Sequence, residues 1–326
     1  PRMHEGRYIR AVNRALSDAL EADPTVIVMG EDIAEAGGSF KATRGLLERF
    51  GPERVRDTPI SELTITGAAV GAALSGLKPV LEIMFMDFVT LAMDAIVNQA
   101  AKSRFMFGGQ ASVPMVVRLP HGGGLNAGPQ HSQCLEAWFA HIPGLKVVCP
   151  ATVEDAYSLL RAAIDDPDPV IVVEHKGLYA TAGDLPDQPS PARIGEARIA
   201  RDGSDVTLVT YGAALATCIE AAGQLQERGV SAEVVDLRSL QPWDKAAVLS
   251  SVAKTHRAVV VHEAVRNFGV GAEIAAIIGE EGFDDLDAPV GRVGAPFMPS
   301  PFARSLEARF IPDAARVVNA ALKTLE

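Results

Sequence analysis

Short apolar runs alternate with amphipathic stretches along most of this chain, and this alternation constrains the fold more than any other feature of the sequence. Val26-Ile-Val-Met29 is closed by Gly30 and follows residues 8–20, whose apolar positions recur every three or four residues. A wholly apolar run is typical of a strand buried in a parallel sheet, and the periodic stretch is typical of a helix. The same pattern predicts further strands at 79–84, 115–118, 145–148 and 170–174, and helices at 90–101, 132–141 and 153–163. Such a series predicts a doubly wound α/β layer.

The alternation lapses once, between residues 183 and 204. This stretch contains Pro186, Pro189 and Pro191 and no long apolar period, which is typical of a linker. Beyond it, strands are expected at 206–210, 233–236 and 258–261, and helices at 213–227, 271–279 and 313–325. We therefore expect two doubly wound α/β domains, residues 1–185 and 205–326, joined by a linker at 186–204. The length of 326 residues agrees, because one domain takes about 150 residues.

The composition narrows the classes of function. A net charge of −11 gives no electrostatic reason to bind nucleic acid or an anionic membrane. No apolar stretch approaches the roughly 20 residues of a membrane span, and the first residues lack the apolar core of a secretory signal. The three cysteines include no Cys-x-x-Cys pair, which argues against a disulfide framework, a zinc ribbon or an iron–sulfur site. We expect a soluble, cytoplasmic protein whose partners are small molecules or other proteins.

Several familiar sites are missing from the sequence. It has no phosphate-binding Gly-x-x-x-x-Gly-Lys-Ser/Thr loop, no Gly-x-Ser-x-Gly nucleophile elbow and no His-Glu-x-x-His zinc motif. The run Gly122-Gly-Gly124 with Gly128 does not fit the dinucleotide-binding pattern, because Ala127 stands where its third glycine would be. We therefore do not expect an NAD site there, and a mobile loop is the plainer interpretation.

One predicted helix consists almost wholly of small residues, Gly67-Ala-Ala-Val-Gly-Ala-Ala-Leu-Ser-Gly76. Glycine within a helix costs up to about 1 kcal/mol relative to alanine, so several together indicate that something packs very close to this helix. Another backbone or a cofactor would explain the pattern. Tight packing of helix on sheet within one fold would explain it equally well.

Polar residues stand at the ends of predicted strands, where open α/β sheets bind ligands. The candidates are Glu31, Asp32, Glu62 and Asp87. Each alone could be a helix cap or a solvated charge. Glu62 stands out because it lies beside the small-residue helix. His131, expected near the start of a helix after the glycine-rich stretch, is an acid/base candidate, with a loop-ordering role as the alternative.

A set of strings, taken together, resembles the beta subunit of thiamine-diphosphate-dependent 2-oxo acid dehydrogenases. The strings are Val28-Met-Gly-Glu-Asp32, Asp57-Thr-Pro-Ile-Ser-Glu62, Gly67-Ala-Ala-Val-Gly71, Val97-Asn-Gln-Ala-Ala-Lys102, Gln130-His-Ser-Gln-Cys134, Pro143-Gly-Leu-Lys-Val-Val148 and Val172-Val-Glu-His175. The likeness runs from near Tyr8 to the C-terminus. Met84-Phe85 and Glu174-His-Lys176 make the acetoin and pyruvate branches the nearest.

The resemblance implies a first domain that binds the pyrimidine half of thiamine diphosphate and a second domain like the transketolase C-terminal domain. A separate alpha subunit would hold magnesium and the diphosphate with a motif that begins Gly-Asp-Gly, and this sequence contains no Gly-Asp-Gly. The expected assembly is α2β2, with the active site between two kinds of chain. A lipoyl-bearing acyltransferase would accept the acyl group, and its small basic binding domain would suit an acidic chain.

The resemblance also implies residue roles. Glu62 matches the catalytic glutamate that hydrogen-bonds a pyrimidine ring nitrogen, and Phe88 matches the aromatic residue that packs on that ring. The other positions that match cofactor contacts are Glu31, Ile60, Ser61 and Met84. Met84 replaces a glutamine of branched-chain members, which weakens a branched-chain assignment.

His131 matches a histidine implied to contact the substrate and to donate a proton when the acyl group passes to lipoamide. Phe85, Met86 and Asp87 would line its pocket. In some relatives potassium orders a nearby loop, and the matching positions here are Met115, Ala163, Ile164, Asp166 and Asp168. An ordinary turn between helix and strand is the alternative for these residues.

The predicted function is that of a pyruvate-type beta subunit, which takes part in oxidative decarboxylation with acyl transfer to lipoamide. An acetoin dehydrogenase beta subunit, one half of a split transketolase-like enzyme and a non-catalytic docking subunit remain alternatives. His262-Glu263 follows a predicted strand of the second domain, and we expect it to cap or pack. The mitochondrial matrix is an alternative to the cytoplasm if a transit peptide is removed.

Overall fold

The computed structural model describes residues 3–326, and only the backbone of residues 3–5. It divides into two compact units. Unit 1 comprises Pro1–His121 and Trp138–Ile194, and unit 2 comprises Gly122–Ala137 and Gly195–Glu326. The segment Gly122–Ala137 therefore clusters with the C-terminal part of the chain, although the predicted first domain included it. The predicted domain bounds stay a prediction.

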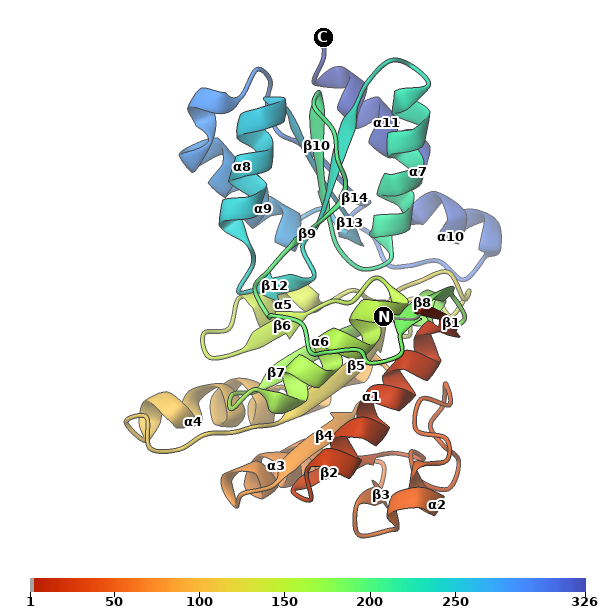
Figure 1. Cartoon of the computed structure of the whole chain (residues 1–326), viewed down its shortest axis with the longest axis vertical. Helices are drawn as coiled ribbons and strands as arrows, with labels where there is room; N and C mark the ends of the chain where they lie inside the picture. Colours follow the sequence, from red (N-terminus) through yellow and green to blue (C-terminus); the bar gives the residue numbers. More distant parts are fainter. Residues whose placement is uncertain (1–2) are drawn as a thin grey trace. The chain divides into compact units, whose positions relative to one another are not determined.

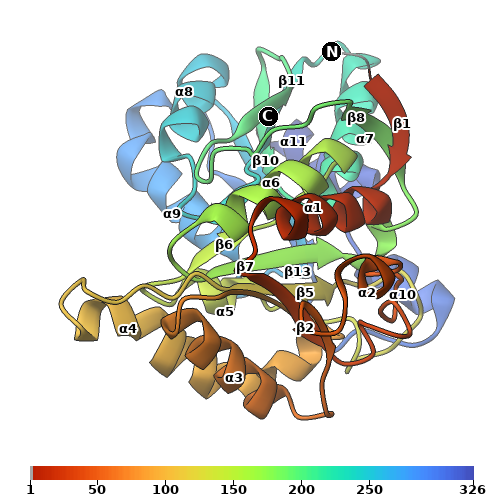
Figure 2. The same cartoon turned by 60° about the horizontal axis from the view of Figure 1, so that its bottom comes forward.

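Unit 1 is built on a parallel sheet with the strand order β6-β7-β5-β4-β2-β3. The bounds are β2 Val26–Gly30, β3 Val55–Asp57, β4 Lys78–Glu82, β5 Val116–His121, β6 Lys146–Val148 and β7 Val170–His175. Helices α1 (Tyr8–Ala22) and α6 (Val153–Asp165) cover one face, and α3 (Glu62–Leu74) and α4 (Ala101–Met106) cover the other (Figure 2). This is the α/β architecture that the sequence predicts.

The core of unit 1 follows from the apolar pattern. Every residue of β2 and β7 is buried, as expected for strands covered on both faces. One face of α1, including Val12, Leu16 and Leu20, is buried against the sheet and α6. The remaining elements of unit 1 are the ribbon of β1 (Met3–Arg7) and β8 (Ala182–Pro186), α2 (Leu46–Phe50), and short turns η1 (Met86–Ala92), η2 (Ala95–Ala100) and η3 (Lys176–Leu178).

Unit 2 has a second sheet with the order β14-β13-β10-β11-β9, in which only β9 among its described strands is antiparallel to its neighbour. The bounds are β9 Arg198–Arg201, β10 Val206–Thr210, β11 Ala232–Asp236, β13 Ala258–Val265 and β14 Gly291–Ala295. Helices α7 (Ala214–Gln226) and α11 (Ala314–Lys323) lie on one face, and α8 (Lys245–Thr255) and α9 (Val270–Glu281) lie on the other (Figure 1). The other elements of unit 2 are β12 (Ser239–Gln241), η4 (Phe283–Asp285) and α10 (Arg304–Phe310). The chain passes from unit 2 to unit 1 within α5 (Glu136–Ala140).

Three local features differ from expectation. The segment expected as a helix at 90–101 is helical, but it consists of the 3₁₀ helix η1 and the π-helix η2, and α4 begins at Ala101. The helix expected at 132–141 is confined to α5, so His131 lies in a loop and not at a helix start. The stretch read as linker contains β9, an edge strand that its polar sequence Arg-Ile-Ala-Arg concealed.

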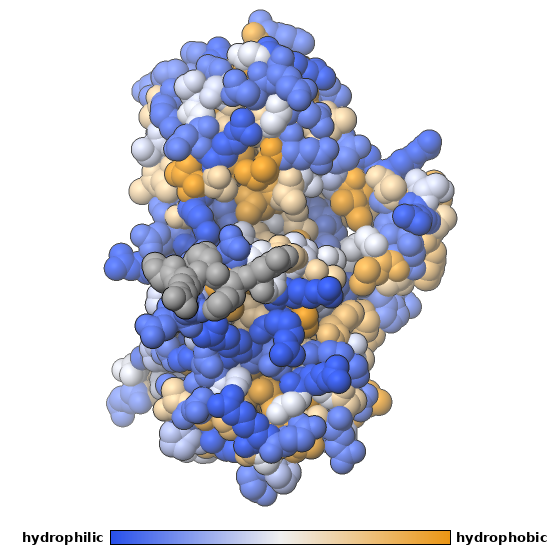
Figure 3. All heavy atoms as spheres, turned by 45° about the vertical axis from the view of Figure 1, so that its right-hand side comes forward, coloured by the Kyte–Doolittle hydropathy of each residue, from blue (hydrophilic) through white to orange (hydrophobic). Residues whose placement is uncertain are grey.

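Large apolar side chains also reach the surface of both units, amid a mostly polar covering (Figure 3). Among the described residues, no helix has the length and apolar character needed to cross a membrane.

Candidate functional site

Two buried carboxylates lie at the carboxyl edge of the unit 1 sheet. Glu31 directly follows β2, and Glu62 is the first residue of α3; each is 7% exposed. Burial, then the negative charge of Glu62 and that of Asp32, raise the pKa of the Glu31 carboxyl, and a hydrogen bond from the Ser61 N–H works in the opposite direction. The structure therefore brings Glu31, Ser61 and Glu62 together, and their role as cofactor contacts stays a prediction.

The backbone around these carboxylates is fixed by close contacts. A Cβ at Gly30 would lie 2.8 Å from the carbonyl oxygen of Glu82 on β4, so only glycine allows the two strands to lie this close at that point. The carboxylate of Asp57 accepts hydrogen bonds from the N–H groups of Ala34 (2.7 Å) and Glu35 (3.3 Å). The loop that follows β2 is therefore tied to the end of β3, and Glu31 is held beside the loop that leads to Glu62.

An aromatic and apolar group follows β4, the strand next to β2. Met86 and Asp87 are buried, whereas Met84, Phe85 and Phe88 are half-buried. The ring centroids of Phe85 and Phe88 are 5.5 Å apart in an edge-on arrangement. Parallel strands present their carboxyl ends at one edge, so this group and the two carboxylates share an edge of the sheet.

These residues fit the pyrimidine half of thiamine diphosphate. Glu31 Oε1 is buried and has no hydrogen-bond partner among the described residues, so a ligand that brings an N–H donor would satisfy it. Half-buried aromatic side chains provide a flat apolar surface next to the carboxylates. Ile60, at 84% exposed, stands on the loop before α3, where a further chain or ligand could cover it.

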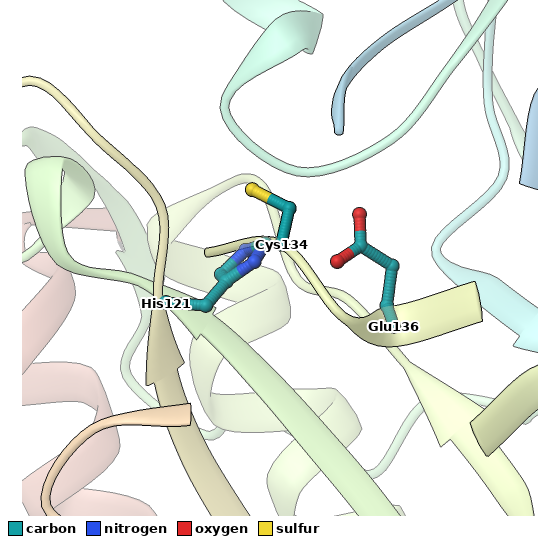
Figure 4. Close-up of side chains that lie close together, drawn as sticks. All are labelled: His121, Cys134 and Glu136. Atoms are coloured by element: carbon teal, nitrogen blue, oxygen red, sulfur yellow. The ribbon is translucent and has the colours of Figure 1, made fainter. Parts of the chain in front are cut away.

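His131 is half-buried and belongs to unit 2, whereas the other predicted cofactor and substrate residues belong to unit 1. Its N–H donates to the Gly128 carbonyl at 3.3 Å, which makes a tight turn. Farther along the segment, Cys134 precedes α5, and Glu136 stands in its first turn (Figure 4). The proposed role of His131 stays a prediction.

The positions predicted to hold potassium lie at the turn between α6 and β7 and at the start of β5. The Asp166 carboxylate accepts from the Lys146 ammonium at 2.7 and 2.9 Å, and the Asp168 carboxylate pairs with Arg104 at 2.5 Å. The Ala163 carbonyl accepts from the Asp166 N–H, and the Met115 carbonyl accepts from the Val170 N–H. The polar groups of this turn therefore have partners within the chain. The potassium site stays a prediction. A comparison of thermal unfolding in potassium chloride and in sodium chloride would test it.

Sequence reasoning missed a buried charge cluster beneath the site. Arg118 on β5 is fully buried and donates to Glu82 on β4 at 2.5 Å and twice to Glu174 on β7 at 2.7 Å. The Tyr179 hydroxyl also donates to Glu174, at 2.7 Å. Burial raises the pKa of Glu82, although Arg118 opposes the shift. The available signal was a charged residue within or at the end of three mostly apolar strands, Glu82, Arg118 and Glu174.

The small-residue helix α3 exposes Gly67 and Gly71. A Cβ added at either glycine would meet no described atom within 4 Å, while Ile65, Ala69 and Ala73 are buried on the opposite side. Tight packing of helix on sheet therefore does not explain these two glycines within the described part of the chain. That another backbone or a cofactor packs on this helix stays a prediction.

Comparisons with known proteins identify the family of each domain. Two family models match, "Transketolase, pyrimidine binding domain" over residues 6–181 and "Transketolase, C-terminal domain" over residues 195–317. The chain is 46% identical over 315 residues to the pyruvate dehydrogenase E1 component subunit beta-2, mitochondrial, of Oryza sativa subsp. japonica, an alignment that covers 95% of this chain and 84% of that protein.

Two further similarities extend the comparison. Identity is 45% over 326 residues with the acetoin:2,6-dichlorophenolindophenol oxidoreductase subunit beta of Cupriavidus necator, covering 97% of this chain and 96% of that one. A solved structure described as "Split gene transketolase, inactive beta4 tetramer" matches with a TM-score of 0.80 and 24% identity, covering 98% of this chain and 99% of that chain. At that identity the likeness concerns the fold alone.

Proposed function

The chain belongs to the family of pyruvate dehydrogenase E1 beta subunits and acetoin oxidoreductase beta subunits, and on that premise we propose that it is one of two kinds of chain that together bind thiamine diphosphate. The proposed reaction is the oxidative decarboxylation of a pyruvate-type 2-oxo acid, with transfer of the acyl group to lipoamide. The buried pair of Glu31 and Glu62 beside half-buried aromatic residues is the observation that carries this proposal.

When bound, thiamine diphosphate supplies a ring that stabilises the electron pair left on the substrate when carbon dioxide departs. The residues of this chain would hold the other ring of the cofactor, the pyrimidine, and place its protons. The Glu62 carboxylate would accept a hydrogen bond from a protonated pyrimidine ring nitrogen. Glu31, whose pKa is raised by burial and by Glu62, would be a further contact of that ring. Phe88 and Met84 would pack on the pyrimidine, with Ile60 and Ser61 at its border.

The roles proposed on the substrate side follow from the resemblance to the family. Phe85, Met86 and Asp87 would contact the substrate, and His131 would hold it and donate a proton when the acyl group is transferred. A histidine suits that task because its ordinary pKa lies close to neutral pH. The alpha chain would hold magnesium and the diphosphate.

The proposed partners are an alpha subunit, in an α2β2 assembly, and a lipoyl-bearing acyltransferase. The exposed small-residue face of α3 supports the first, because it allows a helix of another chain to approach closely. The net charge of −11 supports a basic binding domain on the second. The proposed location is the cytoplasm, or the mitochondrial matrix if a leader is removed; the plant relative is named as mitochondrial.

Acetoin is the second candidate substrate, favoured by the 45% identity with the Cupriavidus necator protein. The test combines this chain with the alpha chain encoded beside it and measures reduction of an artificial electron acceptor with pyruvate, acetoin and branched-chain 2-oxo acids. Reaction with a sugar-phosphate acceptor and no acyltransferase would instead favour a split transketolase-like enzyme.

Glu62→Gln keeps the size of the side chain but removes the carboxylate. We expect turnover to fall by at least about 100-fold, because a positioned acid/base group contributes about 10²–10⁴-fold. Glu48→Gln, at an exposed position of unit 1, is the matched control and should remain fully active. Near-normal turnover of the Glu62→Gln assembly would overturn the mechanism and favour a docking role for this chain.

A further inference from the structure

The glycine-rich loop, residues 122–131, is held by carboxylates from unit 2. Glu307 on α10 is 3% exposed; its Oε1 accepts from the Gly124 N–H at 2.9 Å, and its Oε2 accepts from the backbone and side-chain N–H groups of Asn126 at 3.0 and 2.8 Å. Glu263 on β13 accepts from the Gly123 N–H at 2.6 Å. Hydrogen bonds to a charged acceptor are among the strongest that a backbone makes. The N–H groups of this loop are thus engaged by the chain's own carboxylates.

The backbone of the loop explains why it needs such support. Gly122, Gly124 and Gly128 have φ values of +89°, +90° and +79°, and Asn126 has a φ of +56°. This backbone turns the N–H groups of Gly124 and Asn126 towards one acceptor, as in the anion-binding concavities formed by backbone nests. In this chain the anion is the Glu307 carboxylate. The sequence suggested a mobile loop, whereas in the structure its Gly123, Gly124 and Asn126 N–H groups are held by carboxylates of the chain itself.

Contacts on either side extend this anchoring towards His131. The Phe302 ring lies so close to Gly128 that a Cβ there would be 2.1 Å from it. The Gly128 carbonyl in turn accepts from the His131 N–H. Beyond His131, the buried Tyr211 hydroxyl donates to Glu136 at 2.8 Å. His131 thus lies between two anchored points of one segment.

We propose that Glu307, assisted by Glu263, is a positioning residue that fixes the glycine-rich loop and thereby sets the orientation of His131. The inference rests on the proposed function, because it takes His131 as a substrate-facing group. Neither glutamate touches the reacting atoms in this scheme. The two glutamates act only on the loop, by accepting hydrogen bonds from its backbone N–H groups.

Glu307→Gln tests the proposal in the assembled complex with the alpha chain. The amide keeps one acceptor oxygen, but its NH₂ group cannot accept, so the bonds to either Gly124 or Asn126 are lost. Glu280→Gln, at an exposed position of α9 in the same unit, is the matched control. Asn126→Asp is a second variant, at an exposed position. It places a carboxylate next to that of Glu307, so the two repel each other, and it leaves the core unchanged. This variant is used if Glu307→Gln does not fold.

The first measurement is hydrogen exchange of the peptides that cover residues 122–131. We expect both variants to exchange faster in these peptides and the control to match the wild type. The second measurement is turnover, which should fall by about tenfold or more because small misplacements of a reacting group are costly. The dissociation constant of thiamine diphosphate should stay unchanged, and Glu307→Gln should add no further loss when combined with His131→Ala.

Unchanged exchange of residues 122–131 in both variants would overturn the proposal. So would full turnover of both variants when His131→Ala is inactive, an outcome that leaves the proposed function standing. Full activity of His131→Ala would instead contradict the role proposed for His131 itself. If the turnover losses of Glu307→Gln and His131→Ala multiply in the double variant, Glu307 acts independently of His131.

Discussion

Glu31, a proposed cofactor contact, illustrates how a buried carboxylate can oppose stability. Burial and the charge of Glu62 raise its pKa in the folded protein, so folding binds its proton more tightly than the unfolded chain does. The stability contributed by this proton is complete below the unfolded pKa, near pH 4, and is lost as the pH rises through the folded value. At neutral pH the ionised carboxylate therefore weakens the fold.

Glu31→Gln should consequently stabilise the chain at pH 7–8 by about 1 kcal/mol and have little effect near pH 4. Thermal unfolding of the wild type and the variant across this range measures the difference. Glu35→Gln, in the same loop but exposed, provides the control and should change nothing. A Glu31→Gln variant that is less stable than the wild type at pH 8 would contradict this explanation of the pKa shift.

At the level of elements, the buried cluster joins three neighbouring strands below the site. Arg118 on β5 links Glu82 on β4 to Glu174 on β7, and β4 leads directly into the aromatic residues at Phe85 and Phe88. Removing one partner leaves buried carboxylates without their counter-charge, which is far more costly than loss of an exposed pair.

Arg118→Met should lower the free energy of unfolding by about 3–5 kcal/mol. Arg56→Met breaks an exposed ion pair with Glu53 and should cost less than about 1 kcal/mol. Urea denaturation of the two variants measures both values. Equal effects would mean that the cluster does not stabilise the sheet.

The second element with a testable role is α3. Since a Cβ at Gly67 would meet no described atom, Gly67→Leu should leave the isolated chain folded. If a helix of the alpha chain packs on this face, Gly67→Leu should weaken association by at least about tenfold, because the added side chain prevents close approach of the two helices. Gly279→Leu on α9, where a Cβ also meets nothing, is the control. Sedimentation of the mixed chains measures assembly, and unchanged association of Gly67→Leu would exclude α3 from the contact.

The success of prediction varied between elements for physical reasons. Strands such as β2 and β10 are wholly buried and mostly apolar, so their positions could be predicted to within a residue or two. Edge strand β9 has no such signal, because it pairs on one side only. The turns η1 and η2 carry a helical period, but local propensity does not distinguish them from an α-helix.

For the whole molecule, the predicted fold class and the predicted family are confirmed by the two domain matches and the relatives. The carboxylate pair at the sheet edge could also be anticipated, since Glu31 and Glu62 each adjoin a predictable element. The anchoring of the glycine-rich loop could not be, because Glu263 and Glu307 lie more than 130 residues away in sequence and only the tertiary fold brings them to it.

The central claim is that this chain holds one half of a cofactor site that a second chain completes. Calorimetric titration of thiamine diphosphate with magnesium into this chain, the alpha chain and their mixture tests it most directly. We expect tight binding only by the mixture, and weaker binding when the mixture contains Glu62→Ala. Equally tight binding by this chain alone, or a mixture indifferent to Glu62→Ala, would contradict the claim.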